Sequence, residues 1–188
     1  MCDKNMMTEV KTCNGKASEA LFQKILVAAD DSQQAKWAVQ MAGEMARTTG
    51  AKITLIHAYS VDPGYVIEMA TPVEDLLADL RQAGHELLLR MRGLIPTHVD
   101  VSEMLSEGDA FQQIVAAAEE LRADLIVMGT HGRGRIAHFL LGSTADSVIR
   151  MARCPVLTVA HEPVKPGTCC CNANKAGVAV LHETAARI

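Results

Sequence analysis

A glycine-rich segment in the second half of the chain has residue types that suit phosphate binding. It reads GTHGRGRIAHFLLGST, from Gly129 to Thr144. Gly129 follows an apolar run, where a missing side chain lets a ligand approach the backbone, and Gly132 can expose its amide in the loop. Gly142, Ser143 and Thr144 then open a helix, whose unpaired N–H groups and dipole favour an anion by about 0.3–1 kcal/mol. The spacing predicts a divided phosphate site that needs no P-loop lysine.

The same residues have a second interpretation. A glycine at a strand end and a Ser-Thr pair at a helix start are also ordinary turn and capping residues. Arg133 and Arg135 could supply positive charge to a phosphate, or could be solvated loop arginines. Residue types alone therefore leave ligand binding and turn chemistry as alternatives.

Short apolar runs alternate with amphipathic stretches between residues 22 and 160, and these elements must position the glycine-rich segment. Apolar runs predict strands over 24–30, 52–59, 99–105, 123–129 and 154–159. Apolar residues at helical spacing predict helices between Ser32 and Gly50 and over 73–91, 111–121 and 145–152. The strand over 99–105 is less apolar than the others, so we expect it near an edge of the sheet.

This alternation predicts an α/β fold, an open five-stranded parallel sheet with helices on both faces, because each parallel crossover needs a helix and is right-handed. Ligands of such sheets sit outside the carboxyl ends of the strands, where the strand order reverses. Residues 28–32, 57–58 and 129–132 should therefore lie on one rim.

Length and composition limit the number of domains and the class of partner. The chain has 188 residues, 49% of them hydrophobic, which suits one core. We expect a domain over 22–161, an extension over 1–21, and a tail over 162–188 with a weak helical pattern at its end. The net charge of −4 argues against nucleic acid. We find neither a signal-peptide run nor a membrane-length apolar run, so we expect a cytoplasmic protein without a membrane partner.

The cysteines and histidines indicate little catalysis. In a reducing compartment the six cysteines are expected to be thiols. The run Cys169-Cys170-Cys171 leaves open a thiol or metal-binding module, although structural zinc sites space their cysteines by two to four residues. His57 is expected to be a packed residue at a strand end, and Asp30 could orient a water or hydrogen-bond a ligand.

Several motifs together resemble the nucleotide-binding members of the universal stress protein family. The spacing is Gly129-x2-Gly132-x9-Gly142-Ser143, with THGRG and LLGSTA inside it and CPVLTV after it. KILVAADDS, ITLIHAY and SEGDAFQQIV match the family in order and spacing. The resemblance covers residues 22–160.

The resemblance implies a Rossmann-like fold of the adenine nucleotide alpha hydrolase type, with strand order 3-2-1-4-5, that binds ATP, alone or with Mg²⁺. Adenine and ribose would lie against the ends of the first two strands, and the phosphates in the glycine-rich segment. The implied binding residues are Ala28, Ala29, Asp30, Ala58, Met128, Gly129, Gly132, Arg133, Gly142, Ser143 and Thr144. Many relatives have glycine where this chain has Asp31, a second carboxylate that could repel phosphates or help to hold Mg²⁺.

The resemblance further implies a homodimer that forms through the last strand, at Val156, Leu157, Thr158 and Val159. An apolar edge strand is open to such pairing unless it is covered, and the alternative is that the carboxyl-terminal tail covers it and keeps the chain monomeric. We expect a nucleotide-responsive regulator of the stress response whose protein partner the sequence does not specify. The alternatives are a slow ATPase and the cysteine module.

Overall fold

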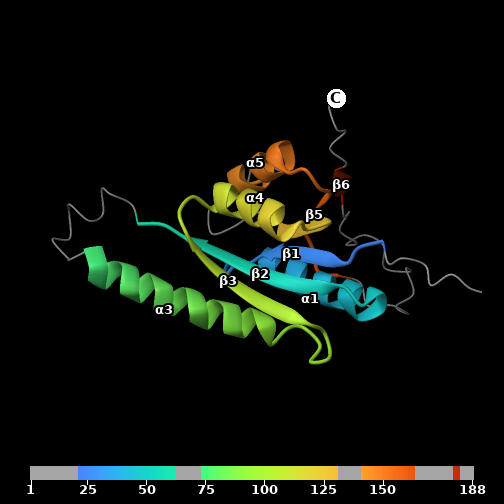
Figure 1. Cartoon of the computed structure of the whole chain (residues 1–188), viewed down its shortest axis with the longest axis horizontal. Coiled ribbons are helices and arrows are strands. Elements are labelled where there is room, and N and C mark those ends of the chain that lie inside the picture. The colour runs from blue at the N-terminus through green and yellow to red at the C-terminus, as the bar shows by residue number, and fades with distance from the viewer. Residues whose placement is uncertain (1–20, 62–72, 131–140, 164–179, 183–188) are drawn as a thin grey trace, which may run out of the picture.

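A parallel sheet of five strands, extended at one edge by a short antiparallel strand, runs through the middle of the molecule (Figure 1). The computed structural model describes residues 21–61, 73–130, 141–163 and 180–182. The strand order is β3-β2-β1-β4-β5-β6, so the predicted order 3-2-1-4-5 is confirmed for the parallel part. The strands are β1 (Lys24–Ala28), β2 (Lys52–Tyr59), β3 (Val101–Glu107), β4 (Leu125–Gly129), β5 (Val156–Val159) and β6 (Val180–His182).

Helices cover both faces of the sheet and divide the core in two. One half of the core lies under α1 (Gln33–Thr49) and α3 (Val73–Arg92), and the other half under α4 (Ala110–Leu121) and α5 (Ser143–Met151). Successive residues of a strand alternate between the halves: Ile25 and Val27 pack in the first, Leu26 in the second. Because both of their faces are buried, the central strands β1, β4 and β5 are largely apolar, and each fully buried apolar side chain stabilises the fold by about 1.5–3 kcal/mol.

Two expectations about the ends of the sheet have different outcomes. The less apolar strand β3 does lie at an edge, beside β2. The weak helical pattern near the end of the tail was wrong for residues 180–182, which form β6 instead. Pairing with β5 explains the difference, since a neighbouring strand edge provides backbone partners that a local pattern does not report.

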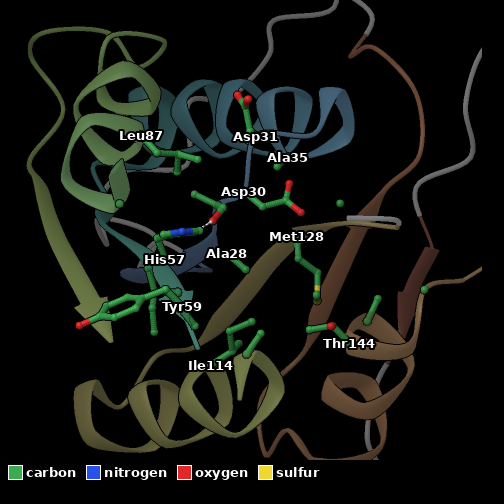
Figure 2. Close-up of a pocket in the computed structure, with 18 of the residues that line it drawn as sticks. Ala28, Asp30, Asp31, Ala35, His57, Tyr59, Leu87, Ile114, Met128 and Thr144 are labelled. Atoms are coloured by element: carbon green, nitrogen blue, oxygen red, sulfur yellow. Dashed lines mark hydrogen bonds between the residues drawn. The ribbon is translucent and has the colours of Figure 1, made fainter. Parts of the chain in front are cut away.

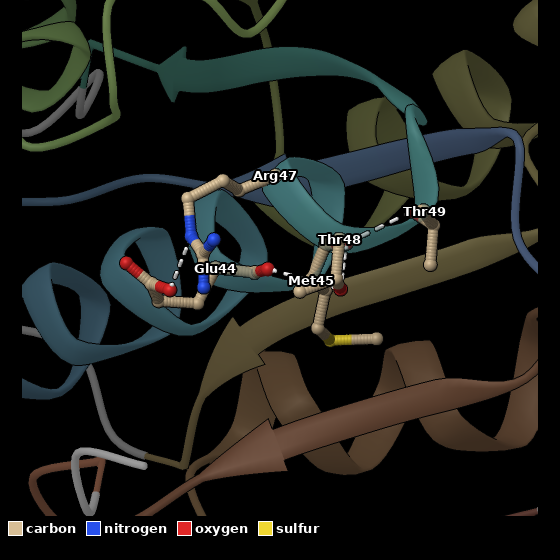
Figure 3. Close-up of polar contacts among 5 residues, drawn as sticks. All are labelled: Glu44, Met45, Arg47, Thr48 and Thr49. Atoms are coloured by element: carbon tan, nitrogen blue, oxygen red, sulfur yellow. Dashed lines mark hydrogen bonds and ion pairs between the residues drawn. The ribbon is translucent and has the colours of Figure 1, made fainter.

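The end of α1 shows how local sequence stops a helix where β2 must begin. Figure 3 shows Thr48 and Thr49, whose hydroxyls each donate to the carbonyl oxygen of Met45 at 2.9 Å. Gly50 follows in the left-handed conformation, with φ of 74°, and donates its N–H to Ala46. Side chains and a glycine cap therefore bond to the carbonyls of Met45 and Ala46 in the last turn of the helix, and the chain turns into β2.

The strand order reverses beside β1, which pairs with β2 on one side and β4 on the other. From β1 the chain proceeds outward to β2 and β3, then returns to β4 and proceeds outward to β5. The carboxyl ends of β1 and β4 are thus the position at which an open α/β sheet leaves a crevice.

Candidate functional site

A cavity of about 1110 Å³ opens at the carboxyl ends of β1, β2 and β4 (Figure 2). Small-molecule sites usually enclose roughly 300–1,000 Å³, so this cavity has room for a ligand of nucleotide size or more. Its lining comes from β1, β2 and β4 and from all four described helices, with Leu87 of α3 and Ile114 of α4 on opposite sides. The cavity thus lies at the switch point that the strand order predicts.

Nine of the eleven predicted binding residues line this cavity. Gly132 and Arg133, the other two, lie outside the described residues, as do His131 and Arg135. The structure therefore brings these nine residues together around one cavity, although they are up to 116 positions apart in the sequence. The nine are Ala28, Ala29, Asp30, Ala58, Met128, Gly129, Gly142, Ser143 and Thr144.

The start of α5 is fixed beside the end of β4 by the backbone. Gly142 donates its N–H to the carbonyl oxygen of Thr130 at 2.7 Å, and Thr130 donates its own N–H to Val159 at 3.1 Å. These hydrogen bonds hold the start of α5 beside the end of β4, so Gly129 and Gly142 lie on the same wall of the cavity. Gly129 and the start of α5, which belong to the two parts of the predicted phosphate site, are thereby brought together.

The amino terminus of α5 differs from those of two other helices in its capping. Ser32 accepts from the Ala35 N–H at the start of α1, and Asp109 accepts from Phe111 and Gln112 at the start of α4. At α5 the cap is Gly142, and among the residues that the structure describes no side chain caps the helix. The first backbone N–H groups of a helix have no intrahelical partner, so α5 presents an uncapped, electropositive end to the cavity.

Gly129 has a packing role besides its place in the cavity wall. A Cβ at this position would lie 2.9 Å from the Cβ of Gln34 and 3.0 Å from the backbone nitrogen of Ala35. Both neighbours belong to the first turn of α1, and a backbone atom cannot move aside cheaply. The absence of a side chain at residue 129 therefore allows α1 to pack against the end of β4, whatever lies in the cavity.

The two adjacent carboxylates after β1 have different surroundings. Asp30 accepts from the Ser32 N–H at 2.9 Å, and Figure 2 shows its side chain pointing into the cavity. Asp31 points away from Thr144 and lies 3.5 Å from Lys36 Nζ and 4.0 Å from the Arg90 guanidinium. The negative charge of Asp31 is thus offset by two cations, on the α1 and α3 side of the site.

His57 is buried at the end of β2, as expected, with 8% of its surface exposed. Its Nδ1 lies 2.7 Å from the carbonyl oxygen of Ala29. A carbonyl can only accept, so Nδ1 carries the hydrogen of this bond. The imidazole therefore ties β2 to the residue that precedes Asp30, and positions the rim.

One wall of the cavity was not anticipated from the sequence. Leu80, Gly84 and Leu87 of α3 line the cavity, and the sequence predicts them within the helix over 73–91 but not as part of the site. Their spacing of three to four residues marks one helical face, and that face continues to Arg90. Small residues on this helical face were the sequence signal that could have identified the wall. A Cβ on Gly84 would lie 2.6 Å from the Leu105 side chain, so α3 packs close to the sheet.

A polar cluster holds the outer end of this wall. Arg81 donates from Nε to the Tyr59 hydroxyl at 2.8 Å and from a terminal nitrogen to Glu107 at 3.2 Å. The hydrogen bond to Tyr59, and then the one to Glu107, raises the pKa of Arg81 above its ordinary value. The cluster joins α3 to the ends of β2 and β3.

The described residues give no support to a metal centre. They include no group of three or more histidine, cysteine or acidic side chains placed to hold an ion. Burial raises the pKa of the Cys154 thiol, which makes it a poorer thiolate ligand. Cys169, Cys170 and Cys171 lie outside the described residues. Within the described residues, no helix combines the length and apolar character that crossing a membrane requires.

Comparisons with known proteins identify a matching family, similar sequences and solved structures with a similar fold. The model of the universal stress protein family matches residues 21–160. A universal stress protein of Thermus aquaticus is 36% identical over 140 residues, which are 74% of this chain and 99% of the relative.

Two solved structures are similar in both fold and sequence. A universal stress protein in complex with cAMP has a TM-score of 0.53 and 30% identity, covering 74% of this chain and 97% of that one. The universal stress protein of Archaeoglobus fulgidus in complex with dAMP has a TM-score of 0.51 and 25% identity, covering 74% and 98%. Both of those proteins were thus solved with an adenine nucleotide bound.

Proposed function

Because this chain belongs to the universal stress protein family, we propose that it binds ATP, alone or with Mg²⁺, in the cavity at the carboxyl ends of β1 and β4. The nucleotide state of the site would alter the surface that the protein presents, which makes it a regulator of stress tolerance in the cytoplasm. The cAMP and dAMP complexes of similar proteins support an adenine nucleotide as the ligand class.

The uncapped start of α5 in the cavity wall is the observation that carries this proposal. An anion there would receive hydrogen bonds from backbone N–H groups that the helix itself cannot use. In the proposed arrangement the adenine and ribose lie toward Ala28, Ala29, Asp30 and Ala58, with Met128 and Gly129 beside the ribose. The phosphates lie toward Gly142, Ser143 and Thr144, and toward Gly132 and Arg133 of the intervening loop.

We propose binding with slow hydrolysis at most. Phosphoryl transfer depends on positive charge placed around the transferred group. Among the described cavity residues, Arg90 is the one lysine or arginine, and it lies beside Asp31 on the α3 side. Backbone N–H groups hold a phosphate through hydrogen bonds but bring no formal positive charge to the transferred group.

The domain that carries this function is proposed to span residues 22–161, with extensions over 1–21 and 162–188. A homodimer through Val156, Leu157, Thr158 and Val159 is part of the same proposal. In the structure the outer edge of β5 is paired with β6, so the two arrangements compete for one strand edge.

The proposal is tested by identifying the ligand. Freshly purified protein is denatured and any released nucleotide is identified by chromatography, and the emptied protein is then titrated with ATP, AMP, cAMP and GTP by calorimetry. We expect adenine nucleotides to bind with dissociation constants of about 1–100 μM, which is about 5–8 kcal/mol. A folded, emptied protein that gives no heat with any of the four would contradict the proposal.

Removing the charge of Asp31 should have little effect on ATP. Since Asp31 pairs with Lys36 and Arg90 and points away from Thr144, Asp31→Asn should change the affinity by less than about threefold, the size of a surface ion pair. Asp30→Asn is the matched change at the carboxylate that points into the cavity, and a lost charged hydrogen bond there should weaken binding about tenfold. Calorimetry with and without Mg²⁺ measures both. A Mg²⁺ requirement that disappears in Asp31→Asn would assign Asp31 to the metal instead.

A further inference from the structure

The outer edge of β5 is covered by a strand from the tail of the same chain. β6 pairs antiparallel with β5, and the register joins Val156 to His182, Leu157 to Leu181 and Thr158 to Val180. An uncovered β5 would present a row of unpaired N–H and C=O groups, which can accept a strand from another molecule. β6 therefore occupies the position that an added strand would take.

The direction of β6 is the one that a second copy of β5 would have. The five central strands are parallel to one another, and β6 alone among the described strands runs the other way. Two identical strands that meet edge to edge around a twofold axis perpendicular to them also run antiparallel, because that axis reverses the strand direction.

The sequence of β6 also repeats that of β5 at the paired positions. β5 begins Val156-Leu157-Thr158, and β6 reads Val180-Leu181-His182. A twofold axis through Leu157 would place leucine opposite Leu157 and valine opposite Thr158. The observed register places Leu181 and Val180 there. The strands differ opposite Val156, where His182 stands in place of the threonine that a second copy would bring.

From direction, register and sequence together, we propose that β6 is an internal substitute for the β5 of a second copy, and that two copies pair through β5 when β6 leaves this edge. This inference rests on the homodimer in the proposed function and specifies its control. The tail is then an intramolecular competitor that keeps the chain monomeric at this edge.

The short length of β6 allows such an exchange. It has three residues, and a strand this short gains little from pairing, so it opens locally at low cost. If the edge is free in about one molecule in ten, the dimer dissociation constant rises about 100-fold, because both copies must have a free edge.

Backbone substitution in β6 of the full chain provides the test. Proline at residue 181 fixes φ and removes the N–H, so Leu181→Pro should release β6, whereas Leu181→Ile retains both and serves as the control. Sedimentation velocity over a concentration series should show a dimer that forms about 100-fold more readily in Leu181→Pro than in the parent or in Leu181→Ile. The family match ends at residue 160, before β6, which indicates that the domain folds without it.

Hydrogen exchange locates the interface in the same samples. The β5 amides should exchange faster in dilute Leu181→Pro and become protected again on dimerisation. Equal association of the parent and Leu181→Pro, or a dimer whose β5 amides stay exchangeable, would overturn the inference. A parent dimer that dissociates on Leu181→Pro would also overturn it, by showing that β6 is swapped between copies.

Nucleotide binding is measured separately in each variant. No β6 residue is among the described residues that line the cavity, so ATP affinity should be the same in the parent, Leu181→Pro and Leu181→Ile. If none of the three proteins bound ATP but Leu181→Pro still dimerised more readily than the parent, the nucleotide proposal would be rejected and this inference would stand.

Discussion

Replacing Gly142 with aspartate is expected to abolish ATP binding while stabilising the folded chain. Residue 142 has φ of −72° and ψ of 156°, which any residue can adopt. An aspartate carboxylate at residue 142 can then accept hydrogen bonds from the first N–H groups of α5, as the Asp109 carboxylate does at the start of α4. That capping, together with the loss of a flexible glycine, should add about 0.5–1 kcal/mol to the free energy of unfolding.

The same carboxylate would occupy the anion position and repel a phosphate. Lost charge-assisted hydrogen bonds of about 1.5–3 kcal/mol each should weaken ATP binding by about 100-fold or more. Calorimetry measures the affinity, and thermal unfolding should shift upward by about 1–4 °C. Gly142→Ala, which adds no capping group, is the control that should retain binding. ATP affinity unchanged in Gly142→Asp, with the higher stability present, would show that phosphates do not lie at this helix end.

Adding a methyl group at residue 129 should destabilise the fold more than the size of the change suggests. In Gly129→Ala the new Cβ lies 2.9–3.0 Å from Gln34 and Ala35, including backbone atoms of α1. The helix or the strand must shift, which should cost about 1–3 kcal/mol, and Gly129→Val should cost more. Urea denaturation of the nucleotide-free protein measures the loss.

A substitution at a second glycine, Gly50, shows how much stability is lost through backbone conformation when the new Cβ meets no crowding. Gly50 has φ of 74° and no atom within 4 Å of an added Cβ, so Gly50→Ala should cost about 1 kcal/mol through its conformation alone. If Gly129→Ala lost ATP binding but kept the parent's stability in urea, the glycine would serve ligand approach and the packing explanation would be wrong.

The alternation of strands and helices could be predicted from the periodicity of the sequence, whereas the strand order 3-2-1-4-5 was implied by the resemblance to the universal stress protein family. Strand ends were less certain: the first predicted strand continues to Asp30, but β1 ends at Ala28. Asp30 instead accepts from the Ser32 N–H and shapes the turn into α1. The pattern of apolar residues does not report such a bond.

The candidate site was predictable where one segment carries it, and less so where distant segments meet. Gly142, Ser143 and Thr144 of the glycine-rich motif line the cavity, and their binding of a phosphate stays a prediction. The α3 wall was missed because Leu80 and Leu87 have the periodicity of ordinary core residues. The packing role of Gly129 was missed for a related reason, since its contact partners are residues 34 and 35 on another element.

The division of the core by the sheet has a consequence for communication within the molecule. The α1 and α3 half and the α4 and α5 half share no side-chain layer, so each can adjust its packing with little effect on the other. The cavity is lined by helices from both halves, with Leu87 on one side and Ile114 on the other. A molecule bound across this rim would contact two packing units that are otherwise separate. A change of packing in either unit would therefore alter the affinity of the protein for that molecule.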